Sequence, residues 1–175
     1  MKFSFFEELT EEEAKKYLNE FLEFGKSRGW KVLGTNIHFT MDLDFKLESL
    51  STVLKSLIPK LKTIRREPDL SLPDFIRKTH SYDRNLFDFD ETSKTIVLAA
   101  AYYLGETFLR NFEQLHWSIG KIDHAAQKMP VVTGFRFGME MPPILIAENM
   151  FAGVISEMSD STSLDKAIQT WVSFA

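Results

Sequence analysis

Apolar side chains recur at helical spacing along two stretches in the first third of the chain. The first opens with Thr10-Glu11-Glu12-Glu13, where the Thr10 hydroxyl can accept from the amide of Glu13 while the Glu13 carboxylate reaches back. This helix should end near Gly29, because glycine tolerates the backbone conformation that commonly follows a helix. The second stretch predicts a helix over residues 48–66, bent or split at Pro59, since proline lacks an amide donor and crowds the preceding turn.

Three more helices are predicted in the second half of the chain. Residues 91–112 are apolar on nearly every side between Ile96 and Leu104, as expected for a central buried helix. A fourth helix should open at Met141-Pro142-Pro143, because proline is tolerated at first helical positions, and should continue to about residue 157. The last helix opens at Ser163-Leu164 and carries one apolar stripe.

Alternation of apolar and polar side chains predicts the strands. Residues 37–45 alternate throughout, and residues 30–33 could pair with them through a turn at Gly34. Two more strands are predicted over residues 115–119 and 131–137. Long helices beside a few strands indicate an α+β fold, with four to five helices around a small, mainly antiparallel sheet of three to four strands. The 175 residues suit a single globular domain, 1–175, and no repeat or linker divides it.

Composition excludes several classes of protein. The chain has 16 phenylalanines, no cysteine and a net charge of −4. The missing cysteine excludes disulfides and thiolate metal sites, and the acidic balance disfavours a nucleic-acid partner. Because no apolar run is long enough to predict a signal peptide or a membrane-crossing helix, we expect a cytoplasmic protein with no membrane partner.

The predicted central helix carries the strongest candidate site. Tyr103, Glu106 and Arg110 stand at spacings of three and four, so Glu106 can pair with Arg110 on one helical face. The pair can form the floor of a pocket, in which Arg110 would hold a carboxylate or phosphate and Glu106 would act as a base. It can also be a purely structural ion pair, because buried charges are tolerated when paired. Trp117 and Glu140 complete the predicted lining of this pocket.

Known catalytic and metal-binding motifs are missing from the sequence. The four histidines show no metal-binding spacing, and Ser118 lacks the first glycine of a hydrolase nucleophile elbow. Glycine-rich phosphate and dinucleotide loops are also absent. We therefore expect no catalytic residue, no metal and no cofactor.

An alternating apolar series lies in the region of the last predicted strand. It consists of Phe135, Phe137, Met139 and Met141, with Gly134 and Gly138 nearby. Such a series fits a strand face over the core. If it were exposed, it would instead be a patch that binds a partner.

Two short motifs resemble landmarks of a group of uncharacterised bacterial α+β domains. Phe45-Lys46-Leu47-Glu48-Ser49-Leu50 is similar to their strand that leads through Glu-Ser-Leu into an amphipathic helix. Tyr102-Tyr103-Leu104-Gly105-Glu106, followed by Arg110-Asn111 and Trp117, resembles their helix with Tyr-x-Gly-Glu and Arg-Asn before a tryptophan strand. The likeness spans about residues 37–174, although Gln114-Leu115-His116 replaces the usual glycine pair. It implies a small cytoplasmic protein of the kind found near toxin-immunity and stress loci, with no established reaction. Gly105 would let another element approach its helix closely.

Two functional hypotheses follow. The first is a non-enzymatic protein that acts by binding a protein partner, in an immunity-type or regulatory role, and a homodimer is compatible with the aromatic content. The alternative is a small-ligand binder or an enzyme without a recognised motif, using the pocket around Glu106 and Arg110.

Overall fold

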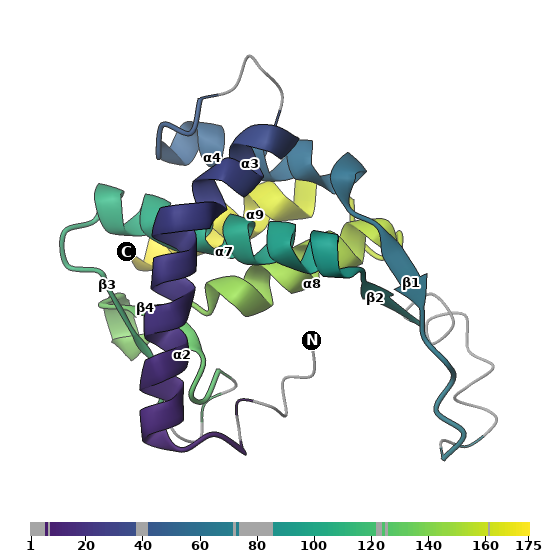
Figure 1. Cartoon of the computed structure of the whole chain (residues 1–175). Coiled ribbons are helices and arrows are strands. Elements are labelled where there is room, and N and C mark those ends of the chain that lie inside the picture. Colours follow the sequence, from purple (N-terminus) through teal and green to yellow (C-terminus); the bar gives the residue numbers. More distant parts are fainter. Residues whose placement is uncertain are drawn as a thin grey trace.

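The computed structural model describes residues 6, 8–37, 42–71, 73, 86–121, 124, 126–160 and 162–175. Its helices surround one long central helix, and its strands are short (Figure 1). The helices are α2 (Glu11–Phe24), α3 (Trp30–Asn36), α4 (Leu47–Leu57), α7 (Glu91–Asn111), α8 (Pro143–Ile155) and α9 (Thr162–Phe174), with the short helical turns η1 (Gly25–Gly29), η2 (Ile58–Lys60) and η3 (Arg136–Gly138). The strands are β1 (Thr63–Arg65), β2 (Phe87–Phe89), β3 (His116–Ile119) and β4 (Pro130–Thr133).

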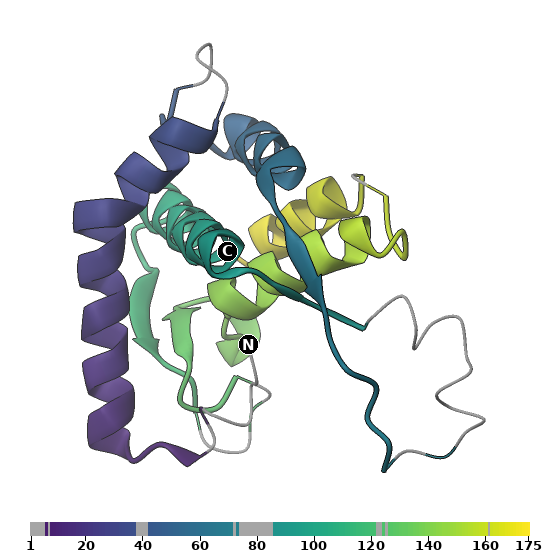
Figure 2. The same cartoon turned by 45° about the vertical axis from the view of Figure 1, so that its right-hand side comes forward.

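The predicted α+β class is confirmed, but the described strands form two ribbons instead of one sheet. Strand β1 pairs antiparallel with β2, and β3 pairs antiparallel with β4. Because β2 leads into α7 and β3 follows it, the two ribbons lie at opposite ends of that helix (Figures 1 and 2). The β3–β4 ribbon lies beside α2, where the candidate site is found (Figure 2).

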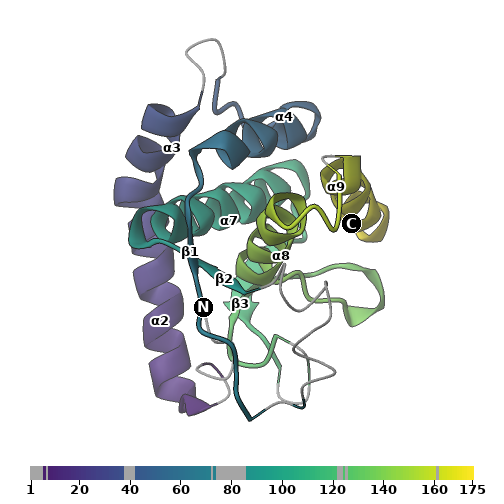
Figure 3. The same cartoon turned by 90° about the vertical axis from the view of Figure 1, so that its right-hand side faces the viewer.

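Helix α7 is the buried centre of the fold, as the sequence predicts. It begins at the N-cap Asp90, whose carboxylate accepts from the amide of Ser93 at 2.7 Å. Its middle, Ala99 to Ala101, has no exposed surface. Helices α3, α4 and α8 and the η1 turn pack against α7 (Figure 3). Buried apolar side chains from each of the described α-helices belong to one cluster around it.

The first predicted helix starts as expected but does not end at Gly29. Both hydrogen bonds of the capping box between Thr10 and Glu13 are present. The helix then passes through the π-helical turn η1 and continues as α3, so the predicted strand over residues 30–33 is wrong. Gly25 makes room in this turn, because a Cβ there would lie 2.1 Å from Cδ2 of Tyr102.

The predicted strand over residues 37–45 is also wrong where the structure describes it. Residues 42–46 have no regular secondary structure, and residues 38–41 lie outside the described part of the chain. Phe45 takes a left-handed backbone conformation with φ 57°, which ends any extended run. The alternation still predicts burial correctly, because Leu43 and Phe45 pack against the core while Asp42 and Asp44 are exposed.

The second predicted helix is shorter than expected. Helix α4 ends at Leu57, and the chain passes through η2, which contains Pro59, into β1. Ile64 therefore belongs to a strand and is 54% exposed, instead of completing the apolar stripe of a helix. Strand β2 was not predicted. The fourth and fifth predicted helices are confirmed as α8 and α9. Within the described residues, no helix is both long and apolar enough to cross a membrane.

Candidate functional site

Glu106 and Arg110 form an ion pair on the surface of α7. Arg110 Nε lies 3.5 Å from Glu106 Oε1, and the two side chains are 52% and 21% exposed. The guanidinium of Arg110 also stacks over the ring of Phe45, 3.4 Å from its centroid. Phe45 thus covers one side of the arginine, and a large part of the remaining guanidinium faces solvent.

Tyr103 does not share the immediate surroundings of Glu106. Its side chain is fully buried and contacts the rings of Trp30 and Phe45 on the inner side of α7. The neighbouring Tyr102 lies on the side of Glu106, stacked parallel to Trp117 with ring centroids 6.2 Å apart. Phe45 is therefore the link between Tyr103 and the Glu106–Arg110 pair, because it contacts both Tyr103 and Arg110.

The indole ring of Trp117 packs directly against the backbone of α7 at Gly105. A Cβ on Gly105 would lie 2.1 Å from Cη2 of Trp117, so only glycine leaves space for the indole. This confirms the expectation that Gly105 permits a close approach. Trp117 Nε1 lies 3.5 Å from Glu106 Oε2, and the ring also meets Phe21 of α2 edge-on. The tryptophan thereby joins α2, α7 and β3.

Burial gives Tyr102 a distinct titration. Burial raises the pKa of the Tyr102 hydroxyl to about 12, and the nearby Glu106 carboxylate adds to this rise. The unfolded chain releases this proton near pH 10. The contribution of neutral Tyr102 to stability is therefore complete below about pH 10 and is lost as the pH rises toward about 12.

We expect Tyr102→Phe to lose less stability than the wild type between about pH 8 and about pH 11, because the variant has no proton to release. Urea unfolding of both proteins at the two pH values measures this difference. Equal losses in the two proteins would contradict the shift assigned to Tyr102.

Glu140 lies at the other end of β3 from Trp117, apart from Glu106 and Arg110. Its side chain is only 4% exposed, and Oε2 accepts from the backbone N–H of Lys121 at 3.1 Å. His124 Nδ1 lies 3.1 Å from the same oxygen, and Lys121 Nζ lies 3.5 Å from Oε1. Glu140 therefore ties the segment before α8 to the connection between β3 and β4. The spacing of these residues in the sequence does not predict the contact between Glu140 and His124.

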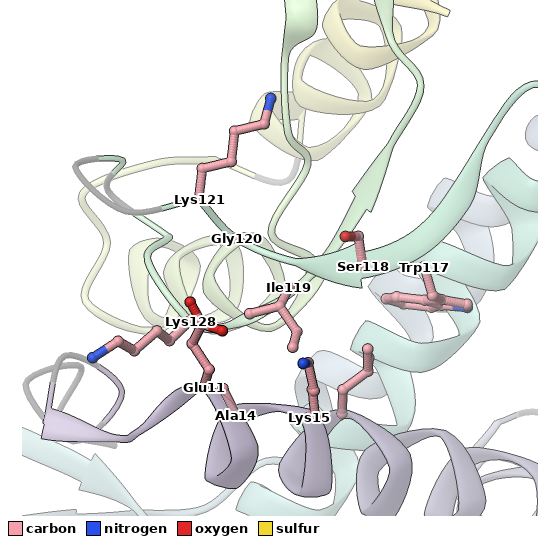
Figure 4. Close-up of a pocket in the computed structure, with 10 residues that line it drawn as sticks. Glu11, Ala14, Lys15, Trp117, Ser118, Ile119, Gly120, Lys121 and Lys128 are labelled. Carbon is pink, nitrogen blue, oxygen red and sulfur yellow. The ribbon is translucent and has the colours of Figure 1, made fainter.

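A pocket of about 480 Å³ lies between α2 and β3 (Figure 4). We call it the α2–β3 pocket. Of the five predicted site residues, only Trp117 lines it. Lys121, which pairs with Glu140, also lines it. The full lining is Glu11, Ala14, Lys15, Leu18, Trp117, Ser118, Ile119, Gly120, Lys121 and Lys128.

Gly120 shapes the end of this pocket. A Cβ there would lie 1.9 Å from the carbonyl oxygen of Ala126, so the glycine lets the chain fold back tightly. Gly120 N–H donates to Met129 O at 2.8 Å, and Lys128 N–H donates to Gly120 O at 2.9 Å. This turn brings Lys121 and Lys128 to the same rim.

The apolar series after β4 divides into buried and exposed members. Strand β4 ends at Thr133, because Gly134 adopts φ 102° and its missing side chain leaves room for the Gln114 carbonyl. Phe135 and Met141 are buried, as a core face requires, whereas Phe137 is 91% exposed and Met139 is 39% exposed. The predicted strand over residues 131–137 is thus too long. We call residues Arg136–Met139 the Phe137 turn.

Sequence reasoning missed the α2–β3 pocket. Lys15 lies on the polar side of an amphipathic helix, where a lysine is ordinarily solvated, and Lys128 lies in a polar connection. Their common location depends on how α2 packs against the β3–β4 ribbon, which no local pattern encodes. The described residues contain no cluster of three or more histidine or acidic side chains that could hold a metal ion.

Comparisons of the chain with protein-family models, with curated proteins and with solved structures found no significant match.

Proposed function

We propose that the protein acts without catalysing a reaction, by binding a protein partner through the Phe137 turn. The observation that carries this proposal is the exposure of Phe137, whose side chain is 91% accessible. An exposed phenylalanine forgoes roughly 2 kcal/mol of stabilisation that burial would give. A partner that covers the ring would recover that stabilisation as binding free energy.

The backbone of the Phe137 turn is anchored on both sides of the exposed ring. Phe137 has φ 60° and Gly138 has φ 67°, so two successive residues take the left-handed conformation. Buried side chains anchor the turn on both sides, Phe135 before it and Met141 after it. Glu140 adds hydrogen bonds to Lys121 and His124. Such preorganisation reduces the entropy lost on binding.

The composition of the turn also favours a protein partner. Exposed Arg136, Phe137 and Met139 are of the three kinds of residue that are enriched in protein interfaces, namely aromatic residues, methionine and arginine. The resemblance to a group of bacterial domains, itself similar in style to small proteins found near toxin-immunity and stress loci, favours an immunity-type or regulatory role in the bacterial cytoplasm. A second copy of the chain is one partner of this kind.

The alternative, a ligand or catalytic pocket around Glu106 and Arg110, has less support. Phe45 covers one side of Arg110, and neither Glu106 nor Arg110 lines the α2–β3 pocket, which the pair approaches through Trp117. Tyr103 and Glu140 lie away from the pair.

The test compares tagged wild-type protein with Phe137→Ala and with Met158→Ala, a matched control in which another exposed side chain, 59% accessible, is shortened. We expect the native host to supply one stoichiometric partner for the wild type and the control. After purification of that partner, Phe137→Ala should weaken binding by about 2 kcal/mol or more, as truncation of a central interface aromatic does.

Two results would contradict this proposal. One is the absence of any stoichiometric partner in the host and of self-association by the purified wild type. The other is a partner that Phe137→Ala binds as tightly as the wild type does. A wild-type dimer that Phe137→Ala converts to monomer, measured by light scattering, would make the second copy the partner.

A further inference from the structure

The α2–β3 pocket is positively charged in a chain whose net charge is −4. Lys15, Lys121 and Lys128 line it together with one acidic residue, Glu11, and Lys121 also pairs with Glu140 behind the rim, which leaves an excess of positive charge. Lys15 points from α2 toward β3 (Figure 4) and has no ion-pair partner among the described residues. Lys121 and Lys128 extend outward from the far rim (Figure 4). A partly enclosed site strengthens the attraction of such cations for an anion, because it excludes water.

Beside Lys15, the walls of the pocket are apolar. Ala14 and Leu18 come from α2. Ile119 points toward α2 from β3 (Figure 4). A pocket of about 480 Å³ lies in the usual size range of small-ligand sites, roughly 300–1,000 Å³. Apolar walls with a few cations at one side suit a ligand that has an apolar body and one charged group.

The strand contributes a backbone donor at the same place. Val132, opposite Trp117, exchanges both of its backbone hydrogen bonds with Met141, at 2.8 and 2.9 Å. Trp117 and Val132 are therefore a non-hydrogen-bonded pair of the ribbon. Because hydrogen bonding alternates along a strand, the N–H group of Ile119 also lies on the edge away from β4. Ile119 lines the pocket, and its N–H group has no hydrogen-bond partner among the described residues, so a ligand oxygen can accept from it.

We infer that the α2–β3 pocket binds a small organic anion, with its apolar body against Leu18 and Ile119 and its carboxylate or phosphate group on Lys15. This site is separate from the Phe137 turn, and the inference does not depend on the proposed protein partner. Replacing Phe137 should therefore leave the pocket unchanged, so the two proposals succeed or fail independently.

The test titrates isotope-labelled protein with four probes and follows amide shifts in NMR spectra. Benzoate and phenyl phosphate carry the two anionic groups, benzyl alcohol lacks the charge, and inorganic phosphate lacks the apolar body. We expect saturable shifts for Ser118 to Lys121 with at least one of the two organic anions. The organic anion with the lower dissociation constant identifies whether the pocket prefers a carboxylate or a phosphate group.

Variants assign the binding to this pocket. Lys15→Gln should lower the affinity for the more tightly bound organic anion by about tenfold, the effect of losing one charge-assisted hydrogen bond. Lys31→Gln, which changes an exposed lysine on α3, is the matched control and should bind as the wild type does. Both side chains are exposed, so neither change should disturb folding.

Three results would overturn the inference. The first is the absence of saturable shifts at β3 with both organic anions. The second is equal affinity of Lys15→Gln and the wild type. The third is equal affinity for benzyl alcohol or for inorganic phosphate, which would remove the need for the charge or for the apolar body.

Discussion

Gly105→Ala should lower the free energy of unfolding by about 2 kcal/mol, although alanine is ordinarily the better helix former by about 1 kcal/mol. The added methyl group would lie 2.1 Å from Cη2 of Trp117, inside the distance that two carbon atoms can share. The indole cannot retreat freely, because Tyr102 stacks on it at 6.2 Å and Phe21 meets it at 5.6 Å. Urea unfolding measures the change.

The chain offers a control of the same chemistry at Gly34. This glycine lies in α3 with no atom within 4 Å of an added Cβ, so Gly34→Ala should be neutral or stabilise by up to about 1 kcal/mol. Adding Trp117→Phe to Gly105→Ala should restore part of the lost stability, because the smaller ring leaves room for the methyl group. If Gly105→Ala is as stable as Gly34→Ala, Trp117 is not fitted against α7 as described.

Phe108→Ala should cost about 3–5 kcal/mol, the usual loss for truncating a buried aromatic ring. Phe108 has no exposed surface, and its ring packs 5.9 Å from Phe112 and 6.0 Å from Phe135. Its removal leaves a cavity in the core, because the surrounding side chains relax only partially into the space. Thermal or urea unfolding measures the loss.

Phe137→Ala removes the same atoms from the surface and should change stability by less than about 0.5 kcal/mol. The contrast between two phenylalanines of one chain tests the exposed fraction assigned to each, 0% for Phe108 and 91% for Phe137. A large loss of stability in Phe137→Ala would mean that its ring is packed in the folded chain. That outcome would also remove the basis of the proposed partner surface.

Local patterns were sufficient for most helices. The capping box at Thr10 and the apolar run in α7 are determined by neighbours within a few residues, so both were predicted. The wrong predictions concern segments whose conformation depends on contacts with residues far away in the sequence. Gly29 resembles a helix end, yet the helix continues because the glycine-containing turn packs against Tyr102, which lies over 70 residues further along the chain.

The candidate site shows the same limit. The pairing of Glu106 with Arg110 follows from helical spacing and is present. The separation of Tyr103 and Glu140 from that pair depends on tertiary packing, and so does the pocket around Lys15. The glycines around Phe137 were a visible signal, but only the structure distinguishes exposed Phe137 from buried Phe135.

The orientation of α3 depends on the number of residues in the π-helical turn between α2 and α3 more than on which residues occupy its exposed positions. A π turn accommodates one residue more than regular α-helical pitch, and one residue corresponds to a rotation of about 100°. Deleting a residue between Gly25 and Gly29 would swing Leu33, now wholly buried, out toward water. Substitutions at the solvent-facing positions of this turn should therefore be tolerated. An insertion or deletion in the turn should instead disrupt the packing of α3 against its neighbours.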